Sequence, residues 1–109
     1  MVSVADKPVT KRMARAEAWV SVGRAVASSL RRSGEVAKGN VLETARLAGI
    51  MAAKRTGELI PMCHPLALDG VEVDATLQGS RVRIETRVYS ESKTGVEMEA
   101  LTGAAVAAL

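Results

Sequence analysis

Residues 71–88 read VEVDATLQGSRVRIETRV, and this stretch determines the fold that the rest of the chain completes. On both sides of its centre, apolar residues alternate with polar ones, which is the period of a strand with one buried face. Gln-Gly-Ser at 78–80 separates the two runs with residues typical of a tight turn. The stretch therefore predicts an antiparallel β-hairpin with one apolar and one charged face, in which Glu72 and Asp74 lie opposite arginines of the second strand.

Two segments before the hairpin are predicted to be a strand and a helix. In residues 11–20, small apolar residues alternate with charged ones, which is the period of a half-buried strand. Gly23–Ser33 has apolar residues at helical spacing, and Ser33 followed by Gly34 marks a turn. The pattern therefore changes from a strand period to a helix period within the first third of the chain.

Asn40 is expected to begin the main helix of the chain. Its side chain is a good N-cap, and Glu43 follows three residues later, as in a capping box. Apolar residues continue at helical spacing and include Leu47 and Met51. The Lys-Arg pair at 54–55 then complements the helix dipole, so we expect the helix to end there.

The last predicted helix covers residues 96–109. The residues expected on its apolar stripe are Leu101, Ala104, Ala105 and Ala108. The sequence stops on this stripe without a capping glycine or a closing cation, which indicates truncation within a helix. Together the elements predict an antiparallel sheet packed against helices, an α+β fold in a single domain over residues 1–109.

Composition restricts the classes of function. Hydrophobic residues make up 48% of the chain, which excludes a disordered charged tail as its main feature. Fifteen basic and twelve acidic residues give a net charge of +3, which fits an anionic small molecule or an acidic partner. The basic residues are spread along the chain, and only Trp19 and Tyr89 offer rings for base stacking, so nucleic acid is not an expected partner.

The expected location is the cytoplasm, with no membrane contact. No apolar run reaches the roughly 20 residues of a membrane span, and residues 1–10 lack the apolar stretch of a signal peptide. Cys63 is the only cysteine, so the chain cannot form an internal disulfide, which suits a reducing compartment.

Cys63 and His64 lie between prolines at positions 61 and 65, in a loop expected to be rigid and non-helical. Histidine is the side-chain type that exchanges protons near neutral pH, so His64 is a candidate catalytic residue. A loop histidine that only packs is the alternative. A Cys–His nucleophile pair is a rival hypothesis, but adjacent side chains point in different directions. One cysteine and one histidine are too few for a zinc site.

Charged residues at two predicted helix starts are the other candidates. Lys38 precedes exposed helix N–H groups, and an ammonium group beside a helix N-terminus is suited to bind phosphate. Glu97 and Glu99 would share a face in an extended segment and diverge in a helix. The simpler alternatives are an ordinary solvated lysine and a pair of acids that only complement the helix dipole.

Four segments, in this order, resemble the molybdenum cofactor biosynthesis protein C family: KGNVL at 38–42, ARLAGIMAAKRT at 45–56, LIPMCHPL at 59–66 and KTGVEMEALT at 93–102. The N-terminal residues also resemble the family's first strand, so the resemblance covers the whole chain. It implies a ferredoxin-like α+β fold and a homo-oligomer, a hexamer built as a trimer of dimers with the active site at the dimer interface.

The resemblance also implies a reaction. A cyclic pyranopterin monophosphate synthase converts the GTP-derived substrate 3',8-cyclo-7,8-dihydroguanosine 5'-triphosphate to cyclic pyranopterin monophosphate and pyrophosphate. This is a lyase step of molybdenum cofactor (molybdopterin) biosynthesis. Lys38 and His64 would be catalytic, and no metal or cofactor is implied. The residues that would bind the substrate and its pterin ring are Met62, Cys63, His64, Glu97, Met98 and Glu99.

Two features distinguish the chain from the family pattern. Asn40 and Ser3 stand where aspartate is usual, and Asn40 keeps the N-cap while removing a charge. The family's last helix continues into a Tyr-Asp-Met-Cys-Lys-like segment with a catalytic aspartate and lysine, which residues 1–109 do not include. We therefore expect either part of the synthase or, as the alternative, a catalytically silent truncated homologue that binds nucleotide or assembles with intact subunits.

Overall fold

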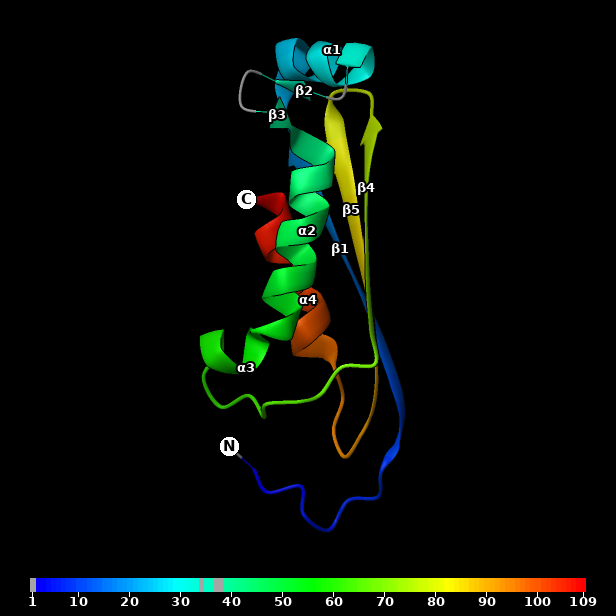
Figure 1. Ribbon diagram of the computed structural model, residues 1–109, viewed down its shortest axis with the longest axis vertical. Helices are drawn as coiled ribbons and strands as arrows, with labels where there is room; N and C mark the ends of the chain where they lie inside the picture. The colour runs from blue at the N-terminus through cyan, green and yellow to red at the C-terminus, as the bar shows by residue number, and fades with distance from the viewer. Residues whose placement is uncertain (1, 34, 37–38) are drawn as a thin grey trace.

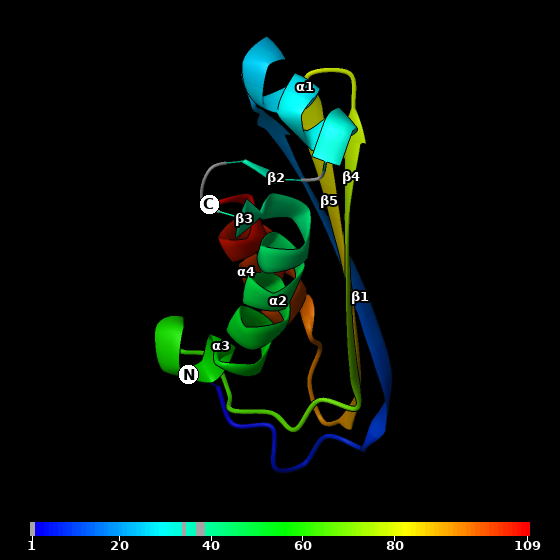
Figure 2. The same ribbon diagram turned by 45° about the horizontal axis from the view of Figure 1, so that its top comes forward.

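Three long strands form one antiparallel sheet, and two long helices cover one of its faces (Figure 1). The computed structural model describes residues 2–33, 35–36 and 39–109. Its elements in chain order are β1 (Thr10–Ser21), α1 (Gly23–Ser33), β2 (Glu35–Val36), β3 (Gly39–Asn40), α2 (Val41–Lys54), α3 (Thr56–Leu59), β4 (Gly70–Gln78), β5 (Arg81–Ser92) and α4 (Glu97–Ala108). The sheet order is β1-β5-β4, and Figure 2 shows α2 and α4 on the same side of it. The predicted α+β fold is confirmed, and the arrangement is consistent with a ferredoxin-like fold.

The central hairpin forms as predicted. β4 and β5 are joined by a two-residue turn in which Gly79 has a φ of 64°, a conformation that glycine adopts without strain. Glu72 lies opposite Arg87, which confirms its predicted partner. Asp74 also pairs with an arginine across the hairpin, as predicted, although its directly opposite neighbour is Glu85 and it reaches Arg87 diagonally at 2.8 Å. The alternation of apolar and polar residues predicts the strands and their two faces, whereas the register of β4 on β5 determines which charged side chains are paired.

The predicted strand and helices before the hairpin also form. The side chain of Asn40 caps α2 by accepting a hydrogen bond from the backbone N–H of Glu43 at 3.0 Å. The carboxylate of Glu43 pairs with Arg46 at 2.7 Å. The two-residue strands β2 and β3 pair with each other and are absent from the prediction, because two residues show no alternation. No helix in the described ranges is long and apolar enough to span a bilayer.

Two glycines let α2 and α4 approach each other closely. A Cβ atom on Gly49 would lie 3.1 Å from the carbonyl oxygen of Gly103 and 3.1 Å from Cβ of Ala107. A Cβ atom on Gly103 would lie 3.1 Å from the carbonyl oxygen of Gly49 and 3.3 Å from Cγ2 of Thr86 in β5. These neighbours are backbone atoms and short side chains, which cannot swing aside. The short distance between α2 and α4 is therefore possible only because Gly49 and Gly103 have no side chain.

This close packing reverses part of the predicted apolar stripes. Leu47 and Met51 of α2 are 53% and 56% exposed, and Leu101 of α4 is 52% exposed. The residues that the two helices bury are mostly small: Gly49, Ala52, Ala53, Glu99, Ala100, Thr102, Gly103, Ala104 and Ala107. The predicted stripe of α4 is thus confirmed at Ala104 and wrong at Leu101 and Ala105, which are both exposed. Helical period alone favours large apolar residues for the core, but the close contact accommodates only small ones.

β5 forms the centre of the core. Its helix-facing residues Val82, Ile84 and Val88 are at most 4% exposed. Thr86 lies on the same face at 0% exposure, and its hydroxyl donates a hydrogen bond to the carbonyl oxygen of Ala100 in α4 at 2.6 Å. This polar contact fixes the position of α4 along the strand, which apolar packing alone does less specifically.

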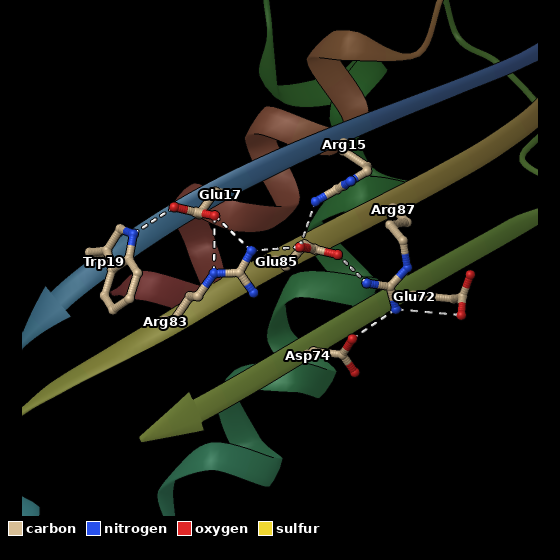
Figure 3. A network of polar contacts seen from close by, with 8 residues as sticks. All are labelled: Arg15, Glu17, Trp19, Glu72, Asp74, Arg83, Glu85 and Arg87. Carbon is tan, nitrogen blue, oxygen red and sulfur yellow. Dashed lines mark hydrogen bonds and ion pairs between the residues drawn. The ribbon is translucent and has the colours of Figure 1, made fainter. Parts of the chain in front are cut away.

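The opposite face of the sheet carries a network of charges (Figure 3). Glu85 in the central strand accepts hydrogen bonds from Arg83 at 2.7 Å, from Arg15 at 3.0 Å and from Arg87. Hydrogen bonds from Arg83 and Arg87 are the main reasons why the pKa of Glu85 falls from 4.5 to about 2. The directly opposite pairs Arg15–Arg87 and Glu17–Glu85 have like charges, so the attractive contacts run diagonally.

Replacing either contact glycine by alanine tests the close packing of α2 and α4. In an open helix position the change would raise the free energy of unfolding by about 1 kcal/mol. Gly49→Ala and Gly103→Ala are instead expected to lower it by about 1–2 kcal/mol, because the added methyl group overpacks the contact. Urea unfolding followed by circular dichroism measures the change. Higher stability of both variants would contradict the contact.

The network predicts how stability depends on acid. The pKa of Glu85 is lower in the folded chain, so its contribution is present above about pH 4.5 and is lost as the pH falls towards 2. Glu85→Gln should reduce stability at pH 7 and flatten the loss between pH 4.5 and 2, measured by urea unfolding across this range. Glu91→Gln, which removes an exposed carboxylate outside the network, is the control. Parallel curves for wild type and Glu85→Gln would show that the network does not stabilise the fold.

Candidate functional site

The loop that contains Cys63 and His64 connects α3 to β4. It is non-helical, as predicted, and Met62 has a φ of 62°, a left-handed conformation that costs a non-glycine residue about 1–2 kcal/mol. Pro65 packs directly on α3, since a Cβ atom on Gly57 would lie 3.0 Å from Cα of Pro65. Backbone strain of this kind concentrates at binding and catalytic sites.

Three hydrogen bonds attach the end of this loop to β5. The hydroxyl of Ser90 donates to the carbonyl oxygen of Ala67 at 2.8 Å. The backbone N–H of Asp69 donates to the carbonyl oxygen of Tyr89 at 2.8 Å, and Oδ2 of Asp69 accepts from the N–H of Glu91 at 2.7 Å. The loop is therefore held by α3 at one end and by the sheet at the other.

The start of α4 is the second component of the site. Because Glu97–Ala108 is helical, the two carboxylates diverge, which excludes the extended alternative. Glu97 is exposed and folds back over Gly95, where a Cβ atom would lie 2.2 Å from Oε2 of Glu97. Glu99 is 3% exposed. Dipole complementation explains a solvated acid such as Glu97, but not the burial of Glu99.

The loop and the helix start meet at Cys63 and Glu99, where Sγ lies 3.8 Å from Oε2. A pocket opens at this contact, and the residues that line it are Met62, Cys63, His64, Leu66, Thr94, Gly95, Glu97, Met98 and Glu99. The six residues expected to bind the substrate thus lie around one pocket, although 33 to 37 positions separate the two segments in sequence. Their proximity is a property of the fold; their binding of a ligand stays a prediction.

Burial determines the protonation of the two groups that meet. It raises the pKa of Glu99 above 4.5, and hydrogen bonds from its own backbone N–H and from Cys63 offset part of this effect. Burial also raises the pKa of the Cys63 thiol above 9.0, and the negative charge of Glu99 adds to the rise. A thiol that holds its proton is a poor nucleophile, so the site disfavours the rival Cys–His nucleophile hypothesis.

Lys38, the other predicted catalytic residue, lies outside the described residues. Lys54, near the end of α2, lines a neighbouring groove that it shares with Glu58, Pro65 and Glu99, among other residues. No three His, Cys, Asp or Glu side chains gather closely enough to hold a metal in residues 2–33, 35–36 and 39–109. Sequence reasoning missed Gly95 as a site residue. The signal was available, because a glycine two residues before an acidic helix start leaves room for a carboxylate that folds back over it.

The fold and the pocket together define an α+β protein in which a strained Cys-His-Pro loop meets an acidic helix start. The chain belongs to the MoaC family, whose model matches residues 1–109.

Relatives with this family's names are similar over the whole chain. It is 59% identical over 111 residues to the cyclic pyranopterin monophosphate synthase of Thermomicrobium roseum. It is 54% identical over 109 residues to the protein of the same name from Streptomyces griseus. It is also 54% identical over 111 residues to molybdenum cofactor biosynthesis protein 1 of Drosophila melanogaster. All of the chain is matched in each case, and it spans 66%, 61% and 20% of these relatives in turn.

The packing of Glu97 over Gly95 leads to a prediction about the pocket. In Gly95→Ala, the new methyl group would collide with the Glu97 carboxylate, which must move, while the backbone tolerates alanine because its φ lies outside the left-handed region. A crystal structure of the variant should show α4 unchanged and Glu97 turned away from position 95. An unmoved carboxylate would show that the glycine is not needed there.

Proposed function

We propose that this chain forms part of a cyclic pyranopterin monophosphate synthase. The observation that supports it is the pocket where the Cys63 loop contacts the start of α4, in a member of the MoaC family. The proposed reaction converts 3',8-cyclo-7,8-dihydroguanosine 5'-triphosphate to cyclic pyranopterin monophosphate and pyrophosphate. It belongs to molybdenum cofactor biosynthesis and takes place in the cytoplasm, with residues 1–109 acting as one domain.

The pocket offers groups suited to this chemistry. Rearranging the ring system requires groups that accept and donate protons, and His64 is proposed for this role. Two carboxylates in different environments suit a guanine-derived ring: Glu97 is exposed and able to accept hydrogen bonds, whereas burial keeps Glu99 protonated to higher pH. Lys38 is proposed to bind the triphosphate or assist proton transfer. Met62 and Met98 supply apolar surface to the pocket.

We also propose that the protein assembles as a homo-oligomer, a hexamer formed as a trimer of dimers. Large apolar side chains on the outward sides of α2 and α4 support an association surface there. They are Leu47, Met51 and Leu101, each more than half exposed. Nucleic acid is not proposed as a partner, and Trp19 supports this view. Its ring lies 4.3 Å from the guanidinium of Arg81 and its Nε1 donates to Glu17 at 2.6 Å, so it is already engaged.

Turnover by variants of the whole protein tests the proposed function. His64→Ala and Lys38→Ala should each abolish formation of cyclic pyranopterin monophosphate while leaving the circular dichroism spectrum and the melting temperature of the protein unchanged. Arg31→Ala is the control, since α1 lies at the opposite end of the molecule from the loop (Figure 1). The assay follows the product by its conversion to a fluorescent pterin.

The outcomes separate the hypotheses. Normal turnover by either variant would refute its assigned role. If the wild-type protein binds the triphosphate but releases no pyrophosphate, the alternative of a catalytically silent homologue is correct. Binding to an unrelated DNA duplex that weakens steeply with salt, without affinity for the triphosphate, would identify a nucleic-acid-binding module instead.

A further inference from the structure

The thiol of Cys63 lies between two oxygen acceptors. Its Sγ is 3.8 Å from Oε2 of Glu99 and 3.8 Å from the carbonyl oxygen of its neighbour His64. The thiol has a single proton, so it donates to one acceptor at a time. A donor prefers an ionised acceptor over a neutral one, because charge-assisted hydrogen bonds are the stronger kind. The direction of the S–H bond therefore depends on the charge of Glu99.

Glu99 has few other groups to hold its carboxylate. It is 3% exposed, and among the residues that the structure describes, Cys63 provides its side-chain hydrogen bond. Among the described residues, the charged groups that line the pocket or the neighbouring groove with it are Glu97 on its own helix and Lys54 and Glu58 across the groove. His64 lines the same pocket from the loop. Because Glu99 is buried, a hydrogen bond from the Cys63 thiol, although weak, stabilises the ionised carboxylate more than it would in water.

Glu85 shows the contrast within the same chain. Three arginines contact that glutamate on the outer face of the sheet, and they lower its pKa to about 2. Glu99 has no such partner in the described residues, and burial raises its pKa. Arginines thus hold Glu85 in its ionised form, whereas burial makes Glu99 easier to protonate.

We propose that Cys63 is a positioning residue, whose S–H group donates to Glu99 when that carboxylate is ionised and turns to the carbonyl oxygen of His64 when it is protonated. The thiol holds the ionised carboxylate in one orientation within the pocket and releases it on protonation. A role for this hydrogen bond in turnover rests on the proposed function, whereas the contact between Cys63 and Glu99 does not. Cys63 keeps its proton throughout, which is consistent with its raised pKa.

Two substitutions separate a hydrogen-bonding role from a packing role. Cys63→Ala removes the donor, and Cys63→Ser removes the sulfur but keeps a hydroxyl donor. The readout is the titration of the Glu99 carboxyl carbon by carbon-13 NMR on the whole protein, with the resonance identified by its loss in Glu99→Gln. The midpoint is expected to rise in Cys63→Ala and to stay at or below the wild-type value in Cys63→Ser. Equal midpoints in the two variants, shifted or not, would overturn the proposal.

The reciprocal experiment observes the thiol. The rate of alkylation by iodoacetamide against pH, followed by mass spectrometry of the peptide that contains Cys63, reports on this thiol alone. In Glu99→Gln the rise in rate should occur at lower pH than in wild type, because burial still raises the pKa of the thiol but the added effect of the Glu99 charge is removed. Glu58→Gln is the matched control, as it faces Glu99 from the groove without contacting the thiol, and should leave the profile unchanged. An unchanged profile in Glu99→Gln would contradict the coupling.

Turnover then separates this proposal from the proposed function. If the protein is the synthase, Cys63→Ser should retain more of kcat than Cys63→Ala, and the pH profile of kcat should shift in the alanine variant only. If the wild-type protein makes no product, the proposed function fails, while the NMR and alkylation results still establish or refute the contact between Cys63 and Glu99.

Discussion

The close approach of α2 and α4 at Gly49 and Gly103 is the constraint on which the rest of the structure depends. Each glycine lies against the backbone of the other, and Gly103 also lies against Thr86 of the central strand. This three-way contact brings both helices onto the sheet at a fixed separation. The chain leaves α2 towards the Cys63 loop and enters α4 at Glu97, so the same separation sets the distance between the two segments that form the pocket.

The two faces of the sheet use charge in opposite ways. On the outer face, arginines from β1 and β5 surround Glu85 and stabilise its ionised form (Figure 3). Arg15 reaches Glu85 diagonally, because its directly opposite neighbour on β5 is Arg87. On the helix side, Glu99 is buried without an arginine or lysine in contact among the described residues, and this burial raises the pKa of its carboxyl group. Uncompensated burial of an acid costs stability, and it is the usual means of tuning a catalytic or binding carboxylate.

Much of the fold was predictable from sequence because it follows from local patterns. Alternation gave the hairpin and β1, and Asn40 with Glu43 gave the start of α2. The buried sides of the helices were not predictable in the same way, since period indicates a stripe but not that Leu101 faces out while Gly103 faces in. That choice depends on a contact between Gly49 and Gly103, which lie more than 50 positions apart in sequence.

The candidate site, like the fold, was predictable only where it follows from local sequence. Residue types and their order indicated Cys63, His64, Glu97 and Glu99, but the meeting of Cys63 with Glu99 depends on the tertiary fold. The opposite environments of the two glutamates likewise required the helical geometry of α4. The strained backbone at Met62 has no local sequence signal at all, because methionine rarely adopts a left-handed conformation.

The central claim is that the contact between the loop and α4 forms the substrate site, and a crystal structure of the whole protein with the cyclised GTP-derived triphosphate tests it most directly. The account predicts that the ring system lies in the pocket, in contact with Met62, Cys63 or His64 on one side and with Glu97 or Glu99 on the other. A triphosphate bound elsewhere, for example in the groove between α2 and the start of β4, with this pocket unchanged, would contradict it.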